Sequence, residues 1–124
     1  MNLWSRARLA VLVIALASVA IADPASAITL DDGDWSVGIV TRSGACDPSY
    51  RVGVLIVRGA VDSGGLAAVQ GQVASSGGVK VTVRSGSQWA YGSGFLNKNR
   101  GRGVWRGQGN SGACDGTWVA EKRG

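Results

Sequence analysis

Apolar and polar residues alternate with a period of two along most of the chain after residue 33. The clearest case is residues 79–84, where Val79, Val81 and Val83 alternate with polar residues. This alternation is typical of strands with one buried face, and no later segment repeats apolar residues at helical spacing. The pattern predicts strands at 34–41, 50–57, 60–61, 69–73, 79–84, 88–96, 104–108 and 114–122.

Glycines and small polar residues separate these strands, as tight turns require. Short strands at such regular spacing usually pair with their neighbours in sequence. The fold class that we predict is therefore all-β: an antiparallel meander of about eight short strands, curled into a small barrel or sandwich. Turns are expected at Arg58-Gly59, 75–78, Gly86-Ser87, 97–102 and 109–112.

Residues 1–27 have the three parts of a secretion signal. Two arginines are followed by fourteen apolar, uncharged residues, and Ala25-Ser26-Ala27 supplies small residues where signal peptidase reads the chain. An uncleaved membrane anchor is the alternative, but such a helix would rise only about 21 Å, short of the roughly 30 Å hydrocarbon core. We expect cleavage after Ala27, which leaves residues 28–124 as one small, periplasmic or secreted domain.

The mature chain has two cysteines, Cys46 and Cys114. An even number in an exported chain predicts a disulfide, because the compartment is oxidising. The bond would close a long loop and stabilise the fold by about 4 kcal/mol on the chain-entropy model. A free thiol nucleophile or a metal-binding pair is the alternative, and the sequence has no histidine to assist either one.

The disulfide also bears on the number of strands. In an up-and-down meander, strands that begin at the same end differ by an even number. Cys46 precedes the second predicted strand and Cys114 begins the last. Both lie at one rim only if Ala60-Val61 is a strand and the last strand is the eighth; otherwise they exceed the roughly 7 Å Cα separation that a disulfide spans. The pairing favours eight strands in a curled or closed sheet.

Tryptophans lie at both ends of the predicted sheet. Trp35 is on the first strand and Trp118 on the last, so they can share a core only if the sheet closes or folds over. Each ring would bury about 150–250 Å². Trp105, on the seventh strand, could pack beside Trp118.

The strand at 88–96 has two unlike faces. One carries Trp89, Tyr91 and Phe95, and the other carries only alanine, glycine and leucine. Aromatic residues of a small barrel are usually part of its core, and this is the interpretation that we favour. The alternative is that Trp89 and Tyr91 stack against a ligand.

The C-terminal part carries a recognisable string, Trp105-x-Gly107 followed by Cys114-x-Gly116-x-Trp118-x-Ala120-x-Lys122-Arg123. Together with Asp32-Gly33-Asp34-Trp35-Ser36-Val37 and Cys46-Asp47-x-x-Tyr50-Arg51, it resembles a group of small exported alphaproteobacterial proteins of unknown function. Members sometimes carry transferred labels that mention haem utilisation or adhesion. The resemblance covers most of the mature chain and implies no catalytic residue. The motif is interpreted structurally: a disulfide to Cys114, close backbone approach at Gly116 and a core ring at Trp118.

The residue types argue against catalysis and against a cofactor. Histidine, the commonest general base and metal ligand, is absent from the sequence. Asp47 and Asp115 are the best pair of carboxylates, but aspartate in such places more commonly caps a turn. Haem iron could be ligated only by Tyr50 or Tyr91. We expect no enzyme, no cofactor and no metal, since the acidic stretch 31–34 also lacks the spaced loop of an EF-hand.

The mature chain is basic, with 11 lysines and arginines against 7 aspartates and glutamates. Lys98, Arg100, Arg102 and Arg106 gather around one predicted turn, and the planar guanidinium suits phosphate and carboxylate. These four are the candidate anion-binding residues. A solubilising charged hairpin, which prevents strand-to-strand aggregation, is the alternative.

Two functions of different class remain. The first is an exported, non-catalytic module that binds an anionic or small apolar ligand, with envelope lipid or acidic polysaccharide as the anionic candidates. The second is a structural or protein-interaction module of the cell envelope that has no ligand. Nucleic acid is not an expected partner of an exported protein. A small barrel can be filled by side chains or can hold one ligand, and the pattern of strands does not distinguish the two.

Overall fold

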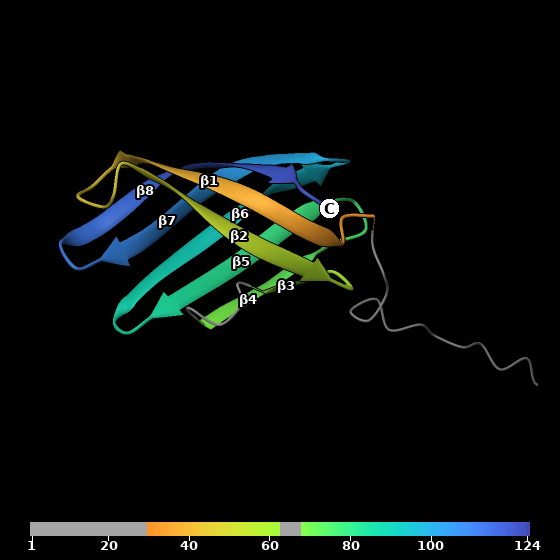
Figure 1. Ribbon diagram of the computed structural model, residues 1–124. Helices are drawn as coiled ribbons and strands as arrows, with labels where there is room; N and C mark the ends of the chain where they lie inside the picture. Colours follow the sequence, from red (N-terminus) through yellow and green to blue (C-terminus); the bar gives the residue numbers. More distant parts are fainter. Residues whose placement is uncertain (1–29, 63–67) are drawn as a thin grey trace, which may run out of the picture.

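The computed structural model describes residues 30–62 and 68–124, in which eight antiparallel strands close into a barrel (Figure 1). Each strand pairs with the next, and the last returns to pair with the first. The predicted eight-stranded meander is confirmed, as a barrel. The strands are β1 (Gly33–Ser43), β2 (Ser49–Val57), β3 (Ala60–Asp62), β4 (Ala68–Val73), β5 (Gly78–Ser85), β6 (Gln88–Asn97), β7 (Arg100–Gly109) and β8 (Gly112–Lys122). The predicted signal peptide lies outside the described residues.

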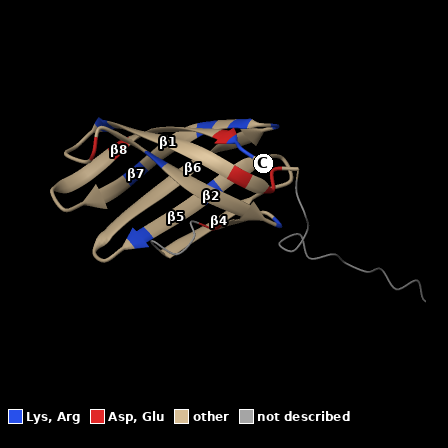
Figure 2. Cartoon of the chain, in the orientation of Figure 1, with Lys and Arg blue, Asp and Glu red and all other residues tan. Residues whose placement is uncertain are grey.

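The period of two sorts the side chains into an inside and an outside. On β1, Trp35 and Val37 lie opposite Val54 and Val52 of β2, and all four face the interior. Lysines and arginines of β5 and β7 lie on the outer surface, where Figure 2 shows the charged residues distributed over the strands. The interior core consists of Trp35, Ile56, Val61, Val73, Val79, Leu96 and Ala120. Among the residues described, no helix is long and apolar enough to cross a membrane.

The turn between β2 and β3 forms where the sequence predicts it. Arg58 and Gly59 have φ angles of 52° and 77°, as in the two-residue turns that match the twist of a hairpin. The carboxylate of Asp32 accepts hydrogen bonds from the backbone N–H groups of both residues, at 2.7 and 3.0 Å. Asp32 therefore holds this turn, a structural role for one of the acidic residues at 31–34.

The basic turn predicted at 97–102 is too long. Pairing continues to Asn97 on β6 and Arg100 on β7, so only Lys98 and Asn99 connect the two strands. Lys98 adopts a φ angle of 59°. The glycines that suggested a longer turn lie within β7 and face the interior, where a tryptophan ring packs against them, as described below.

The predicted disulfide is confirmed. The Sγ atoms of Cys46 and Cys114 are 2.08 Å apart and their Cα atoms 6.2 Å apart. Cys46 lies in the connection between β1 and β2, and Cys114 lies near the start of β8. The bond therefore ties the connection between β1 and β2 to β8 at one rim, which we call the disulfide end. The opposite end holds the C-terminus and the turn from β2 to β3, and we call it the terminal end.

Candidate functional site

The buried core lies toward the terminal end of the barrel. Backbone hydrogen bonds extend the pairing of neighbouring strands at this end: Asp34 donates to Gly124, Leu96 to Gly77, and Lys122 to Asn99, at 2.8–2.9 Å. Each of the seven core side chains lies on the part of its strand nearest these bonds, and each is at most 9% exposed. These side chains pack together at this end, where a broad, open depression also reaches Val73, Val79 and Ala120.

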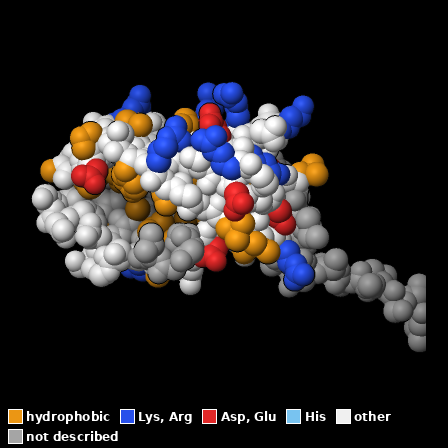
Figure 3. Space-filling view, viewed as in Figure 1, with side chains coloured by type: hydrophobic (Ala, Val, Ile, Leu, Met, Phe, Trp, Pro, Cys, Tyr) orange, Lys and Arg blue, Asp and Glu red, His pale blue; other side chains and the backbone are white. Residues whose placement is uncertain are grey.

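The interior at the disulfide end is different. Several apolar side chains that face inward there, such as Ile39, Val52 and Val83, are only half-buried. Because they point into the barrel, their exposure means that solvent reaches the lumen at this end. Figure 3 shows a hollow in the barrel with hydrophobic side chains at its base. The barrel interior is therefore packed at the terminal end and open at the disulfide end, and we call the open part the cup. The wall of the cup nearest the disulfide end, which we call its upper wall, carries Ile39, Val52, Val69, Val83, Ala90 and Trp105.

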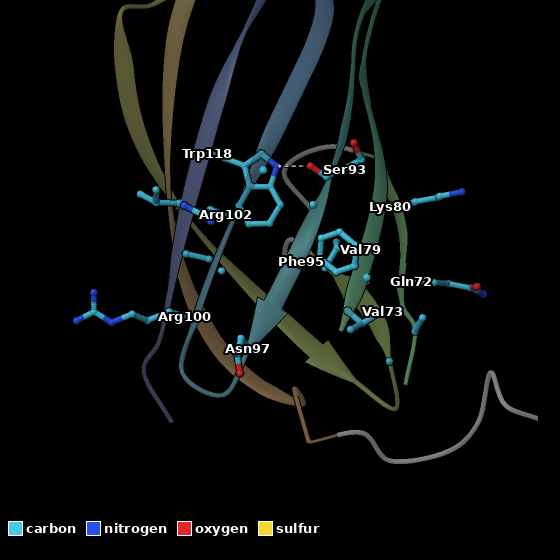
Figure 4. Close-up of a pocket in the computed structure, with 18 of the residues that line it drawn as sticks. Gln72, Val73, Val79, Lys80, Ser93, Phe95, Asn97, Arg100, Arg102 and Trp118 are labelled. Carbon is cyan, nitrogen blue, oxygen red and sulfur yellow. Dashed lines mark hydrogen bonds between the residues drawn. The ribbon is translucent and has the colours of Figure 1, made fainter. Parts of the chain in front are cut away.

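Trp118 lies flat against the wall of this cup. Its Nε1–H donates to the backbone oxygens of Ser93 and Val104, both at 3.2 Å (Figure 4). A Cβ atom added to either Gly94 or Gly103 would come within 2.6 Å of the indole. The ring thus covers glycines of β6 and β7, and these inward positions must be glycine to admit it.

Trp105 does the same on the other side. Its Nε1–H donates to the backbone oxygen of Val40 on β1 at 3.1 Å, and a Cβ atom at Gly116 would come 2.9 Å from that nitrogen. The prediction that Trp105 packs beside Trp118 is replaced by a different arrangement, in which the two indoles extend in opposite directions around the wall. Each ring therefore packs against the backbone of the neighbouring strands.

Tyr50 lies at the disulfide end, opposite Ile39. It is 51% exposed. Partial burial, and the nearby charge of Asp47, raise the pKa of the Tyr50 phenol above its ordinary value. The hydroxyl therefore stays protonated at neutral pH, as a hydrogen-bond donor at the mouth of an otherwise apolar cup.

The aromatic residues of β6 face outward. Trp89 is 39% exposed and Phe95 is 65% exposed, while Ala90 and Gly94 occupy the inward positions. The interpretation of these aromatics as core is therefore wrong. The physical reason is Trp118, whose ring takes the space that side chains from β6 would otherwise fill.

The candidate basic residues extend along β7 next to these rings. Arg102 lies opposite Phe95, and Arg106 lies opposite Tyr91, with its guanidinium carbon 5.7 Å from the ring centroid. Lys98 lies in the turn, whereas Arg100, Arg102 and Arg106 follow a line of about 20 Å along β7 rather than surround a turn.

β5 adds two more cations on the other side of β6. Lys80 lies opposite Ser93 and Arg84 lies opposite Trp89. Phe95, Lys80 and Arg102 border a broad, open depression, and Figure 4 shows Lys80 extending to one side of β6 and Arg100 to the other. We call the following residues the outer strip: Trp89, Tyr91 and Phe95, flanked by Lys80, Arg84, Arg102 and Arg106.

The two aspartates considered for catalysis both lie toward the disulfide end. The backbone oxygen of Asp47 accepts a hydrogen bond from the hydroxyl of Thr41 at 2.5 Å, and Asp115 lies on β8 opposite Arg106. Within residues 30–62 and 68–124, no group of three or more Asp, Glu, Cys or His side chains is placed to hold a metal ion.

Comparison with known proteins gives no assignment: no family model matches the chain, and no curated protein or solved structure is significantly similar to it. The similarity to small exported proteins stays a prediction from the sequence. The cup and the outer strip are the two features of the structure that bear on function.

Proposed function

We propose that this protein is an exported, non-catalytic binding module that holds a small apolar ligand inside its barrel. The observation that carries the proposal is the exposure of apolar side chains in the lumen at the disulfide end. Removal of apolar surface from water is favourable by about 25 cal/mol for each Å², so a ligand that covers these side chains gains binding free energy. An eight-stranded barrel is either filled by side chains or holds one small ligand, and half-exposed apolar side chains in the lumen favour the second.

The chemistry of the cup matches such a ligand. Small-molecule sites are lined mainly by apolar side chains, with a few polar groups that orient the ligand. Valine, isoleucine and tryptophan line the upper wall, and the protonated hydroxyl of Tyr50 is available as a donor at the mouth. An apolar molecule with one polar end, such as a medium-chain alcohol or acid, fits this arrangement.

Export is part of the proposal. It is supported by the signal-like pattern of residues 1–27 and by the Cys46–Cys114 bond, which is compatible with an oxidising compartment. The mass of the protein recovered from the periplasm or medium of an expressing bacterium should correspond to a chain that begins at Ile28. A recovered chain that still contains Met1 would contradict cleavage.

Binding in the cup can be tested with a neutral apolar fluorophore, N-phenyl-1-naphthylamine, added to the oxidised mature protein. We expect saturable binding with enhanced emission. The variant Ala90→Phe places a ring in the upper part of the cup and should weaken binding at least tenfold. Ala113→Phe is the matched control, because Ala113 lies at the same end but on the outer surface.

Val52→Phe, on the opposite wall, is a second blocking variant in case Ala90→Phe does not fold. Absence of saturable binding by the unmodified protein would contradict the proposal and favour the alternative, a structural or protein-interaction module without a ligand. Equal binding by the folded inward and outward variants would also contradict it, because the fluorophore would then bind elsewhere.

A further inference from the structure

We propose that the outer strip is a second binding site and that it takes a linear acidic polysaccharide. The strip lies on the opposite face of the sheet from the lumen, so this site is independent of the ligand proposed for the cup. Trp89 and Phe95 are 39% and 65% exposed, because the ring of Trp118 takes the interior space beside β6. Three aromatic residues on one outward face of a single strand form an apolar patch that is typical of a binding surface.

The shape of the strip indicates a linear partner. Trp89 and Phe95 are six residues apart on β6, which corresponds to about 20 Å along a strand. The strip is only three strands wide, or about 10 Å between the outer two. A surface that is long, narrow and open along its length fits an extended polymer better than a compact ligand.

The charges on both sides of the rings indicate that the polymer is acidic. Arg84 lies opposite Trp89, and Arg102 lies opposite Phe95. The guanidinium fork can bind both oxygens of a carboxylate. Asp115 and Glu121 of β8 lie opposite Arg106 and Arg100 and reduce the positive charge on that side. A polymer with a carboxylate on each sugar matches this moderate charge better than a densely charged polyphosphate.

Polar side chains between the rings suit sugar hydroxyls. Thr82 lies opposite Tyr91, Ser93 lies between Lys80 and Val104, and Gln108 lies opposite Trp89. Each can donate and accept hydrogen bonds. Uronic-acid sugars combine these features, because they offer hydroxyls, a carboxylate and an apolar ring face that can rest on Trp89 or Phe95.

Single-stranded nucleic acid is the nearest competitor, since aromatic residues among cations also bind bases. Successive bases need successive free rings, but the ring of Tyr91 has the guanidinium of Arg106 over it at 5.7 Å. Trp89 and Phe95 are too far apart to hold neighbouring bases. The spacing of the rings therefore favours the polysaccharide.

The test is affinity electrophoresis of the oxidised mature protein in native gels that contain a polymer. Alginate and polygalacturonate, two polymers of uronic acids, are the probes. Dextran is the neutral control, and oligodeoxythymidylate and phosphatidylglycerol vesicles represent the competing partners. We expect retardation by at least one uronic-acid polymer, weaker at high salt, and no retardation by dextran.

Two variants link retardation to the strip. Phe95→Ser and Arg102→Gln should each weaken binding to the polymer at least fivefold. Arg42→Gln is the charge-matched control, because Arg42 is exposed near the end of β1 and does not line the depression beside the strip. All three variants should keep the fluorophore binding of the unmodified protein, since none of these side chains faces the lumen.

Three results would overturn the proposal. One is failure of both uronic-acid polymers to bind. Another is binding of the oligonucleotide or the vesicles alone, which would assign the strip to that partner. The third is an equal loss in Arg102→Gln and Arg42→Gln with no loss in Phe95→Ser, because binding would then depend only on net charge.

Discussion

Replacing both Cys46 and Cys114 by serine should lower the free energy of unfolding by about 4 kcal/mol. The bond joins residues 68 positions apart, so its loss gives the unfolded chain much more freedom. In the folded state it ties the connection between β1 and β2 to β8. Urea denaturation of the oxidised protein and the double variant would measure the difference.

The matched control is the unmodified protein after reduction with dithiothreitol, which should unfold near the same urea concentration as the double variant. Unfolding of the double variant at the same midpoint as the oxidised protein would show that the sheet closes without this bond. A domain of this size has only about 5–15 kcal/mol of stability, so the predicted loss is a large part of the total.

The variant Trp118→Ala should lower the free energy of unfolding by about 3 kcal/mol, at the low end for loss of a large ring because Trp118 is half-buried. The ring covers the glycines of β6 and β7, and its N–H donates to two backbone oxygens. Its removal leaves an empty surface that no neighbouring side chain can fill. Thermal or urea unfolding would give the value.

Val119→Ala is the matched control for Trp118→Ala. Val119 is the next residue of β8, faces outward and is 53% exposed, so its truncation should change stability by less than about 0.5 kcal/mol. Equal, small effects of the two substitutions would remove Trp118 from the structural wall of the cup.

The sequence predicts the strands well because their outer and inner positions differ in polarity. Trp35, Val37 and Ile39 alternate with polar or small residues on β1, and the valines of β5 alternate with polar residues in the same way. The cysteines indicate the number of strands, because Cys46 and Cys114 lie at one rim only if the last strand is the eighth. That prediction depended on Ala60 and Val61, which the structure places in β3.

The inner and outer faces of β6 could not be assigned by polarity, because both faces are apolar. The deciding feature is the ring of Trp118, which lies across Gly94 and Gly103 and leaves no room for aromatic residues from β6. A signal for this exists in the sequence: glycines at alternate positions of 92–94 and 101–103, together with a tryptophan on the last strand. It becomes readable only once the register of three strands is known.

The glycines of β7 also explain why the sequence predicts a start at residue 104, although the strand begins at Arg100. Gly101 and Gly103 suggest a turn when they are read locally, but they are inward positions under an indole. The candidate basic residues are consequently set along a strand, where the pleat directs Arg102 and Arg106 to the same outer face as Phe95. The depth to which the barrel is filled depends on packing around all eight strands, which local patterns do not determine.

The central claim, that the lumen at the disulfide end holds an apolar ligand, is tested most directly by crystallography with a bromoalkane such as 1-bromodecane. Bromine is located by its anomalous scattering. We predict bromine inside the barrel, within van der Waals distance of upper-wall side chains such as Ile39 and Trp105. Bromine found only on the outer surface, or a lumen closed by side chains at both ends, would contradict the account.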